Sequence, residues 1–245
     1  MKAAAILVSL IGTVAMQTPA SAPTQSGTHP GYDVARTTAA HAALLDADAA
    51  AWSAAPAIEW GPARYTTRFR ALWADRALYV RFDSVDPDPW HTMTARDAHL
   101  WEEEVVEVFL DPAHQGYNYF ELEINPANIV CDVRMLSAYP NVKSDLEWNH
   151  EGLDTRVTPL RDAGGATVGW TATASIPWPG FKSLPTPERI ALPPKPGDVW
   201  RFNAYRIKRP GGPANPKEGV MLLAWSPTGT PSFHTPSAFR NFTFK

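Results

Sequence analysis

The chain has 245 residues, of which 44% are hydrophobic and 19% charged, and its formal net charge is −3. This balance is typical of a folded globular protein and excludes a disordered chain. The acidic excess and the absence of a basic run argue against a nucleic-acid partner, because phosphate binding needs a basic surface. Cys131 is the only cysteine, which excludes an internal disulfide and a cysteine-based zinc cluster and favours a small buried side chain.

Residues 1–20 have the pattern of a signal peptide. Lys2 supplies the basic start, and the apolar run that follows, residues 3–16, is too short to span a bilayer. Small residues around Ala20 offer a cleavage site, and an N-terminal membrane anchor is the alternative. We therefore expect export across the inner membrane, to the periplasm or the extracellular space, and no membrane attachment of the mature chain.

Residues 21–40 are rich in Pro, Thr, Ser and Gly and are expected to form a flexible N-terminal arm. Neither a second linker nor an internal repeat follows, so residues 41–245 are expected to form a single domain. The first clear strand pattern covers residues 66–73. After a short turn, residues 78–83 alternate with period two, which predicts a hairpin with Leu78, Val80 and Phe82 on the core face.

Two strand patterns in the middle of the chain carry acids. In residues 104–111, Glu107 alternates away from the apolar face, and in residues 117–124, Glu121 and Glu123 do the same. Glu121 and Glu123 would lie about 7 Å apart along a strand, which is compatible with the paired carboxylates of a glycosidase. Alternating acids are, however, usual on an exposed strand face, so we expect no enzyme activity.

Glu107 is the most suggestive acid in the sequence. A carboxylate between apolar neighbours is costly to bury without partners, and Val105 and Phe109 share its strand face. It is therefore either a ligand-binding group or one half of an ion pair across the sheet with Arg206 or Arg134.

Further strand patterns complete the chain at residues 130–135, 155–160, 169–176, 199–207, 220–225 and 239–244. Short strands at this spacing, without a convincing amphipathic helix, predict an all-β fold. The expected architecture is an antiparallel β-sandwich, a jelly-roll or immunoglobulin-like arrangement of two sheets, with few short helical turns.

Two aromatic residues fall in loops. Trp101 precedes the strand at residues 104–111, and a tryptophan in a loop more often forms recognition surface than core, with edge packing as the alternative. Phe233 lies in a polar, Pro-flanked segment and either folds inward as a plug or faces a ligand. The tryptophans within strand patterns are expected in the core: Trp73, Trp170, Trp178 and Trp225.

The acidic run Glu102-Glu103-Glu104 is compatible with three roles. It is a solvated face, a set of calcium ligands, or the source of a catalytic acid. Asp46 and Asp48 are a second candidate source of calcium ligands. Neither run has the fixed spacing of an EF-hand loop, so the sequence assigns no metal ligands.

Several segments, in order along the chain, resemble the family-nine carbohydrate-binding modules. They are LWADRALYV at 72–80, WEEEVVEVFLD at 101–111, GWTATASIPW at 169–178, VWRFN at 199–203, AWSP at 224–227 and FHTPSAF at 233–239. The resemblance extends over roughly residues 42–245. It implies a β-sandwich that binds a sugar, in a secreted protein associated with polysaccharide breakdown or uptake.

The resemblance also implies a ligand site. In that family two aromatic side chains hold a terminal sugar ring between them, and these positions fall on Trp101 and Phe233. The family's hydroxyl-binding glutamate falls on Glu107. Two positions depart, because Glu121 stands where the family has Arg and Tyr205 where it has Gln. The expected partner is a mono- or oligosaccharide or the end of a polysaccharide. No cofactor is expected to be required, and structural calcium is the metal ion to test.

Other functions compete with a sugar-binding protein. A glycoside-processing enzyme would use paired carboxylates such as Glu121 and Glu123. A haem protein would need axial ligands on facing strands, and only Met135 and Met221 among the methionines and histidines fall in strand patterns. An envelope interaction module without a sugar ligand would account for the departures at Glu121 and Tyr205.

Overall fold

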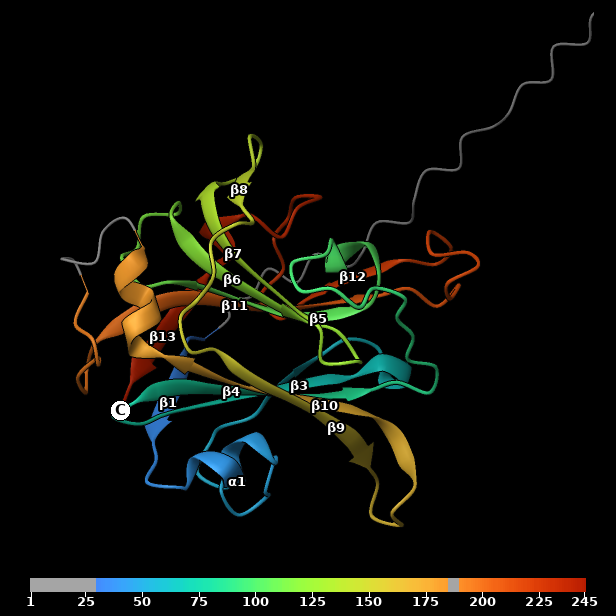
Figure 1. The fold of residues 1–245 in the computed structure, drawn as a ribbon, viewed down its shortest axis with the longest axis horizontal. Coiled ribbons are helices and arrows are strands. Elements are labelled where there is room, and N and C mark those ends of the chain that lie inside the picture. Colours follow the sequence, from blue (N-terminus) through green and yellow to red (C-terminus); the bar gives the residue numbers. More distant parts are fainter. Residues whose placement is uncertain (1–29, 185–189) are drawn as a thin grey trace, which may run out of the picture.

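The computed structural model describes residues 30–184 and 190–245, so the predicted signal peptide lies outside the described residues. Figure 1 shows two layers of strands that face each other, with the short helix α1 (His41–Leu45) beneath the lower layer. In the part of the chain that is described, no helix has both the length and the apolar character needed to cross a membrane.

The upper layer in Figure 1 is the first sheet, with strand order β8-β7-β6-β5-β11-β13 and with β12 paired to β11. Its members are β5 (Val105–Asp111), β6 (Tyr119–Ile124), β7 (Val130–Ser137), β8 (Lys143–Asp145), β11 (Val199–Lys208), β12 (Met221–Ala224) and β13 (Arg240–Phe244). Short 3-10 turns η2 (Leu100–Glu102) and η5 (Pro236–Ala238) lie in its loops.

The lower layer is the second sheet, with strand order β3-β4-β10-β9 and with β2 also paired to β3. Its members are β2 (Ile58–Trp60), β3 (Thr67–Trp73), β4 (Ala77–Val85), β9 (Asp154–Arg161) and β10 (Thr167–Pro177), accompanied by the 3-10 turns η1 (Ala63–Tyr65) and η3 (Trp178–Ser183). The predicted all-β sandwich is therefore confirmed. The sequence patterns missed β2, β8 and α1, which are each five residues or shorter.

β1 (Tyr32–Arg36) joins the two sheets and corrects one prediction. Its first residues pair with β13, where Tyr32 lies opposite Phe242, and its last residues pair with β3, where Ala35 lies opposite Leu72. Both pairings are parallel, whereas the other pairings among the described strands are antiparallel. The expectation of a flexible arm over residues 21–40 is wrong for this strand, because Tyr32 and Val34 alternate into the core and are 2% and 0% exposed.

Tyr32→Phe is expected to lower the free energy of unfolding by about 1–3 kcal/mol, the cost of leaving a buried donor unpaired. The Tyr32 hydroxyl accepts the Ala71 N–H at 2.7 Å and donates to the Pro56 carbonyl at 2.6 Å. Urea unfolding measures the change. Tyr117→Phe removes a hydroxyl from a residue that is 48% exposed and should change stability by less than about 0.5 kcal/mol. Equal stability of the two variants would mean that this contact does not anchor β1.

The main core fills the space between the sheets and follows the predicted alternation. The apolar faces of the strands meet there: Leu78, Val80 and Phe82; Val106, Val108 and Leu110; Phe120, Leu122 and Ile124. The four tryptophans expected in the core also lie there, each at most 6% exposed, although Trp178 begins η3 instead of ending a strand. A separate apolar cluster lies on the outer face of the first sheet, and α1 packs on the outer face of the second.

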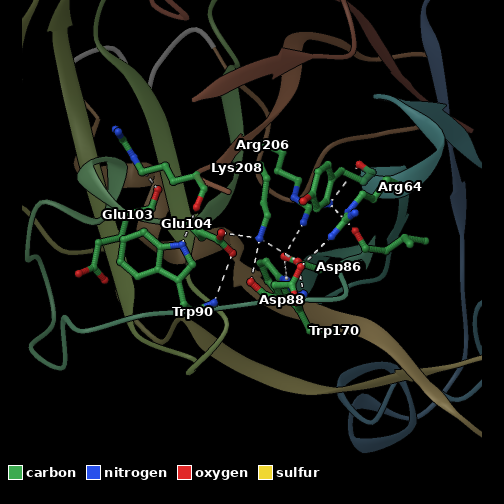
Figure 2. Close-up of polar contacts among 12 residues, drawn as sticks. Arg64, Asp86, Asp88, Trp90, Glu103, Glu104, Trp170, Arg206 and Lys208 are labelled. Carbon is green, nitrogen blue, oxygen red and sulfur yellow. Dashed lines mark hydrogen bonds and ion pairs between the residues drawn. The ribbon is translucent and has the colours of Figure 1, made fainter. Parts of the chain in front are cut away.

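A buried ion network connects the two sheets at one edge (Figure 2). Arg206 on β11 donates to the Val85 carbonyl at 2.9 Å and pairs with Asp86, which follows β4, at 2.7 Å. Lys208, also on β11, pairs with Asp86 at 2.8 Å and with Glu104 at 2.5 Å. These four side chains are each at most 1% exposed. Two cations and two carboxylates therefore compensate each other between the layers.

Candidate ligand-binding site

A cleft of about 410 Å³ opens on the outer face of the first sheet. Its lining comes from β5, β6, β7, β8, β11 and β12 and from the loops before β5 and after β12. Four of the five site residues predicted from the sequence line it: Trp101, Glu107, Glu121 and Phe233. Glu123 and His234 line it as well. The period-two alternation that put Glu123 on the face of Glu121 was the signal that could have assigned Glu123 to the site.

Trp101 is held at the rim by its neighbours. It lies within η2, next to Leu100, which is 0% exposed and anchors the turn in the outer-face cluster. One face of the indole stacks on His99, with ring centroids 4.4 Å apart and planes 19° apart. The guanidinium of Arg209 donates to the Trp101 carbonyl at 2.8 Å. These contacts fix the backbone and ring of a half-buried tryptophan that lines the cleft.

Phe233 is held from below by Tyr205. The two rings stack with centroids 4.2 Å apart and planes 21° apart, and the Tyr205 hydroxyl donates to the Phe233 carbonyl at 3.0 Å. Tyr205 is 0% exposed and is not part of the cleft lining. The structure therefore places Tyr205 beneath the cleft as a support for Phe233, whereas Phe233 itself is half-buried and lines the cleft.

Three glutamates meet on the floor. Glu107 on β5 lies directly opposite Glu123 on β6, and Glu121 precedes Glu123 by two residues on the same face. One carboxylate oxygen of each lies within 4.8 Å of the corresponding oxygens of the other two. The side chains are 2%, 4% and 1% exposed for Glu107, Glu121 and Glu123. The expectation that the β6 acids lie on an exposed face is wrong, because loops cover this face of the sheet.

The ion-pair alternative for Glu107 is also wrong. The residue opposite Glu107 on β11 is Tyr205. Arg206, the next residue, points to the other face of β11 and pairs with Asp86. Arg134 lies opposite Phe120 in the β6–β7 register and pairs with Asp145 at 2.5 Å. In each case the alternation of the strand turns the arginine away from the cleft.

The run Glu102-Glu103-Glu104 separates into three environments. Glu102 is exposed, Glu103 accepts the backbone N–H of Thr92 at 2.8 Å, and Glu104 pairs with Lys208. Only Glu107, Glu121 and Glu123 form a close group of metal-ligating atoms among the described residues. The alternative that residues 102–104 together form a metal site is not compatible with these partners.

The floor of the cleft is electrostatically unusual. Burial, reinforced by the neighbouring carboxylates, raises the pKa of Glu107 and of Glu123 well above its ordinary value, and burial raises the pKa of Glu121 to about 8. His234 lies beside them, its Nδ1 3.8 Å from Glu121 Oε2 and 3.0 Å from the Tyr119 hydroxyl. Burial lowers the pKa of His234 to about 4, so this ring is neutral at pH 7.

Comparison with known proteins gives one family and one fold. The model of a family described as carbohydrate family 9 binding domain-like matches residues 25–192. A Bacteroides uniformis ATCC 8492 protein, provisionally described as carbohydrate-binding, has a TM-score of 0.63 at 16% identity, covering 88% of this chain and 100% of its own. No curated protein is significantly similar to the chain.

Two structures of a family 9 carbohydrate-binding module from Caldicellulosiruptor kristjanssonii are also similar, each with a TM-score of 0.58 at 15% identity. The complex with cellotriose matches 87% of this chain and 93% of its own. The complex with glucose matches 87% and 95%. At these identities the likeness establishes the shared β-sandwich fold.

Proposed function

The chain belongs to the carbohydrate family 9 binding domain-like family, and from this premise we propose that it is a sugar-binding protein and not an enzyme. In this proposal a sugar ring lies in the cleft between Trp101 and Phe233, and the carboxylates on the floor bind its hydroxyls. The protein would serve polysaccharide breakdown or uptake, in the periplasm or outside the cell, as the predicted signal peptide directs.

The observation that carries the proposal is the combination of two flat aromatic rings with buried, unsatisfied acceptors in one cleft. Sugars present C–H patches that pack on aromatic faces and hydroxyls that donate to carboxylates. Trp101 and Phe233 supply rings whose positions are fixed by stacking on His99 and Tyr205. The cleft volume of about 410 Å³ falls within the usual range of small-molecule sites.

The arrangement of the carboxylates supports a binding role. A glycosidase places two carboxyl groups on either side of the bond that it cleaves. Here Glu107, Glu121 and Glu123 converge on a single point within 4.8 Å of one another. Three acceptors grouped on one side of the cleft suit the binding of neighbouring hydroxyls.

Trp101→Ala is expected to weaken sugar binding about tenfold or more, because an aromatic face contributes on the order of 1 kcal/mol beyond the area it buries. Glucose and cellotriose are the first ligands to test, since the similar family 9 module was solved with each. Isothermal titration calorimetry of the mature chain in calcium-containing buffer measures the affinity. Tyr117→Ala is the control, because Tyr117 is 48% exposed and lies outside the cleft.

Two outcomes would count against the proposal. Unchanged affinity in Trp101→Ala would place the sugar elsewhere. A folded wild-type chain that binds no member of a broad sugar panel would favour an envelope interaction module, with the aromatic pair serving only for packing.

A further inference from the structure

Three carboxyl groups lie together on the floor of the cleft, and no lysine or arginine pairs with them in the described part of the chain. Three carboxylates removed from water are costly to keep ionised unless a positive charge lies beside them. The one basic side chain within ion-pair distance of them among the described residues is His234, whose Nδ1 lies 3.8 Å from Glu121 Oε2, beyond hydrogen-bond distance.

Arg209 also lines the cleft, but its guanidinium is already engaged. It donates to the backbone carbonyls of Trp101 at 2.8 Å, Glu103 at 3.1 Å and Pro216 at 2.9 Å. Its hydrogen bonds hold the rim of the cleft in place and are not directed at the three carboxylates.

Each of the three carboxylates has an oxygen that is buried and accepts no hydrogen bond: Oε1 of Glu107, Oε2 of Glu121 and Oε2 of Glu123. Buried acceptors of this kind call for a partner. Oxygen ligands suit hard divalent cations, and calcium binds them at about 2.3–2.6 Å. Oxygens that lie within 4.8 Å of one another are close enough to bind one such ion together.

We propose that Glu107, Glu121 and Glu123 bind a divalent cation of the calcium type on the floor of the cleft. Calcium accepts six to eight oxygen ligands, so three carboxylates leave positions that face the cleft. Neighbouring sugar hydroxyls would occupy these positions, which makes sugar binding depend on the cation. This last step rests on the proposed function, whereas the cation site itself does not.

Calorimetric titration of the chelator-treated mature chain with CaCl₂ tests the site. We expect one saturable event, and Glu107→Gln or Glu123→Gln should weaken it at least tenfold, because each removes one charged ligand. Glu102→Gln should bind calcium like the wild type, since Glu102 is exposed and outside the cleft. Terbium luminescence excited through tryptophan gives a second measurement, because Trp101 lines the same cleft.

Thermal unfolding guards against a folding defect in these variants. Glu107→Gln replaces a buried carboxyl by an amide of the same shape, so it should fold without calcium. Calcium should raise the Tm of the wild type and of Glu102→Gln but not of Glu107→Gln. Absence of any calcium heat together with an unchanged Tm would overturn the cation site and assign the neutralisation to protons.

Sugar titrations with calcium and with chelator separate the two proposals. Binding of glucose or cellotriose in calcium, lost in chelator, supports both. Calcium binding without any sugar binding keeps the cation site and overturns the proposed function. Equal sugar binding in both buffers keeps the proposed function and overturns the cation-dependent step. Binding of glucosamine hydrochloride in chelator, without calcium binding, would assign the carboxylates to a cationic sugar and overturn the cation site.

Discussion

Asp86→Asn is expected to lower the free energy of unfolding by about 3–5 kcal/mol, the usual cost of removing one partner from a buried ion pair. Asp86 is the carboxylate that holds both cations of the network between the sheets, Arg206 at 2.7 Å and Lys208 at 2.8 Å. Its loss removes the carboxylate that pairs with Arg206 and leaves Lys208 with Glu104 as its carboxylate partner. Guanidinium chloride unfolding followed by tryptophan fluorescence measures the change.

Asp88→Asn is the matched control, because it makes the same substitution two residues away. The Asp88 carboxylate pairs with Arg64 at 3.0 Å, and both side chains are more than 60% exposed. An exposed pair contributes about 0–1 kcal/mol, so this variant should be close to wild type in stability. A comparable loss in both variants would mean that the network in Figure 2 contributes no more than a surface ion pair.

This network also marks a limit of sequence reasoning. Period-two alternation identifies which side of a strand is apolar, and it correctly assigned the faces of β5 and β6. It cannot identify partners that are distant in sequence: Lys208 meets Asp86 and Glu104 only because β11 crosses the end of β4. Glu104 belonged to a run of three acids that were alike in the sequence and differ in the fold.

The N-terminal strand shows a different limit. The short alternating segment Tyr32-Asp33-Val34 is surrounded by Pro, Thr, Ser and Gly, so its local composition indicates an arm. Its strand conformation comes from pairing with β13 and β3. The pairing with β13 forms only when the C-terminal end of the chain has folded against it. Tertiary contacts therefore override local preference here.

For the site, alternation and the family resemblance identified four residues that line one cleft. They did not predict the role of the fifth residue, Tyr205, which lies beneath the cleft. Tyr205 lies next to Glu107 across β5 and β11, as a ligand contact would, yet the loop that carries Phe233 lies over it. The path of a loop is not encoded in strand periodicity. The same covering loops bury Glu121 and Glu123, which a strand pattern alone assigns to an exposed face.

The contribution of His150 to the free energy of unfolding is expected to fall by about 2 kcal/mol between pH 7.5 and pH 5. This ring is 3% exposed, packs against Phe120 and Phe181, and its Nε2 lies 2.8 Å from the Pro177 carbonyl. Burial lowers the pKa of His150 from 6.5 to about 4. Between these two values His150 takes up a proton in the unfolded chain but not in the folded chain, so its contribution to stability is lost as the pH falls. The comparison with a His150 variant isolates this contribution from that of the cleft glutamates, whose raised pKa values act in the opposite direction.

The full effect of His150 is about 3 kcal/mol once the pH is below both pKa values, at about 1.4 kcal/mol per pH unit. His150→Gln is expected to be less stable than wild type at pH 7.5 but to lose less stability on acidification, so the two curves should converge. Asp132, whose pKa is raised by burial, and its partner Arg96 lie beside the ring, and both are retained in the variant. Urea unfolding at several pH values measures the difference, with exposed His91→Gln following the wild-type curve. Parallel curves for wild type and His150→Gln would mean that the buried ring does not account for the acid sensitivity.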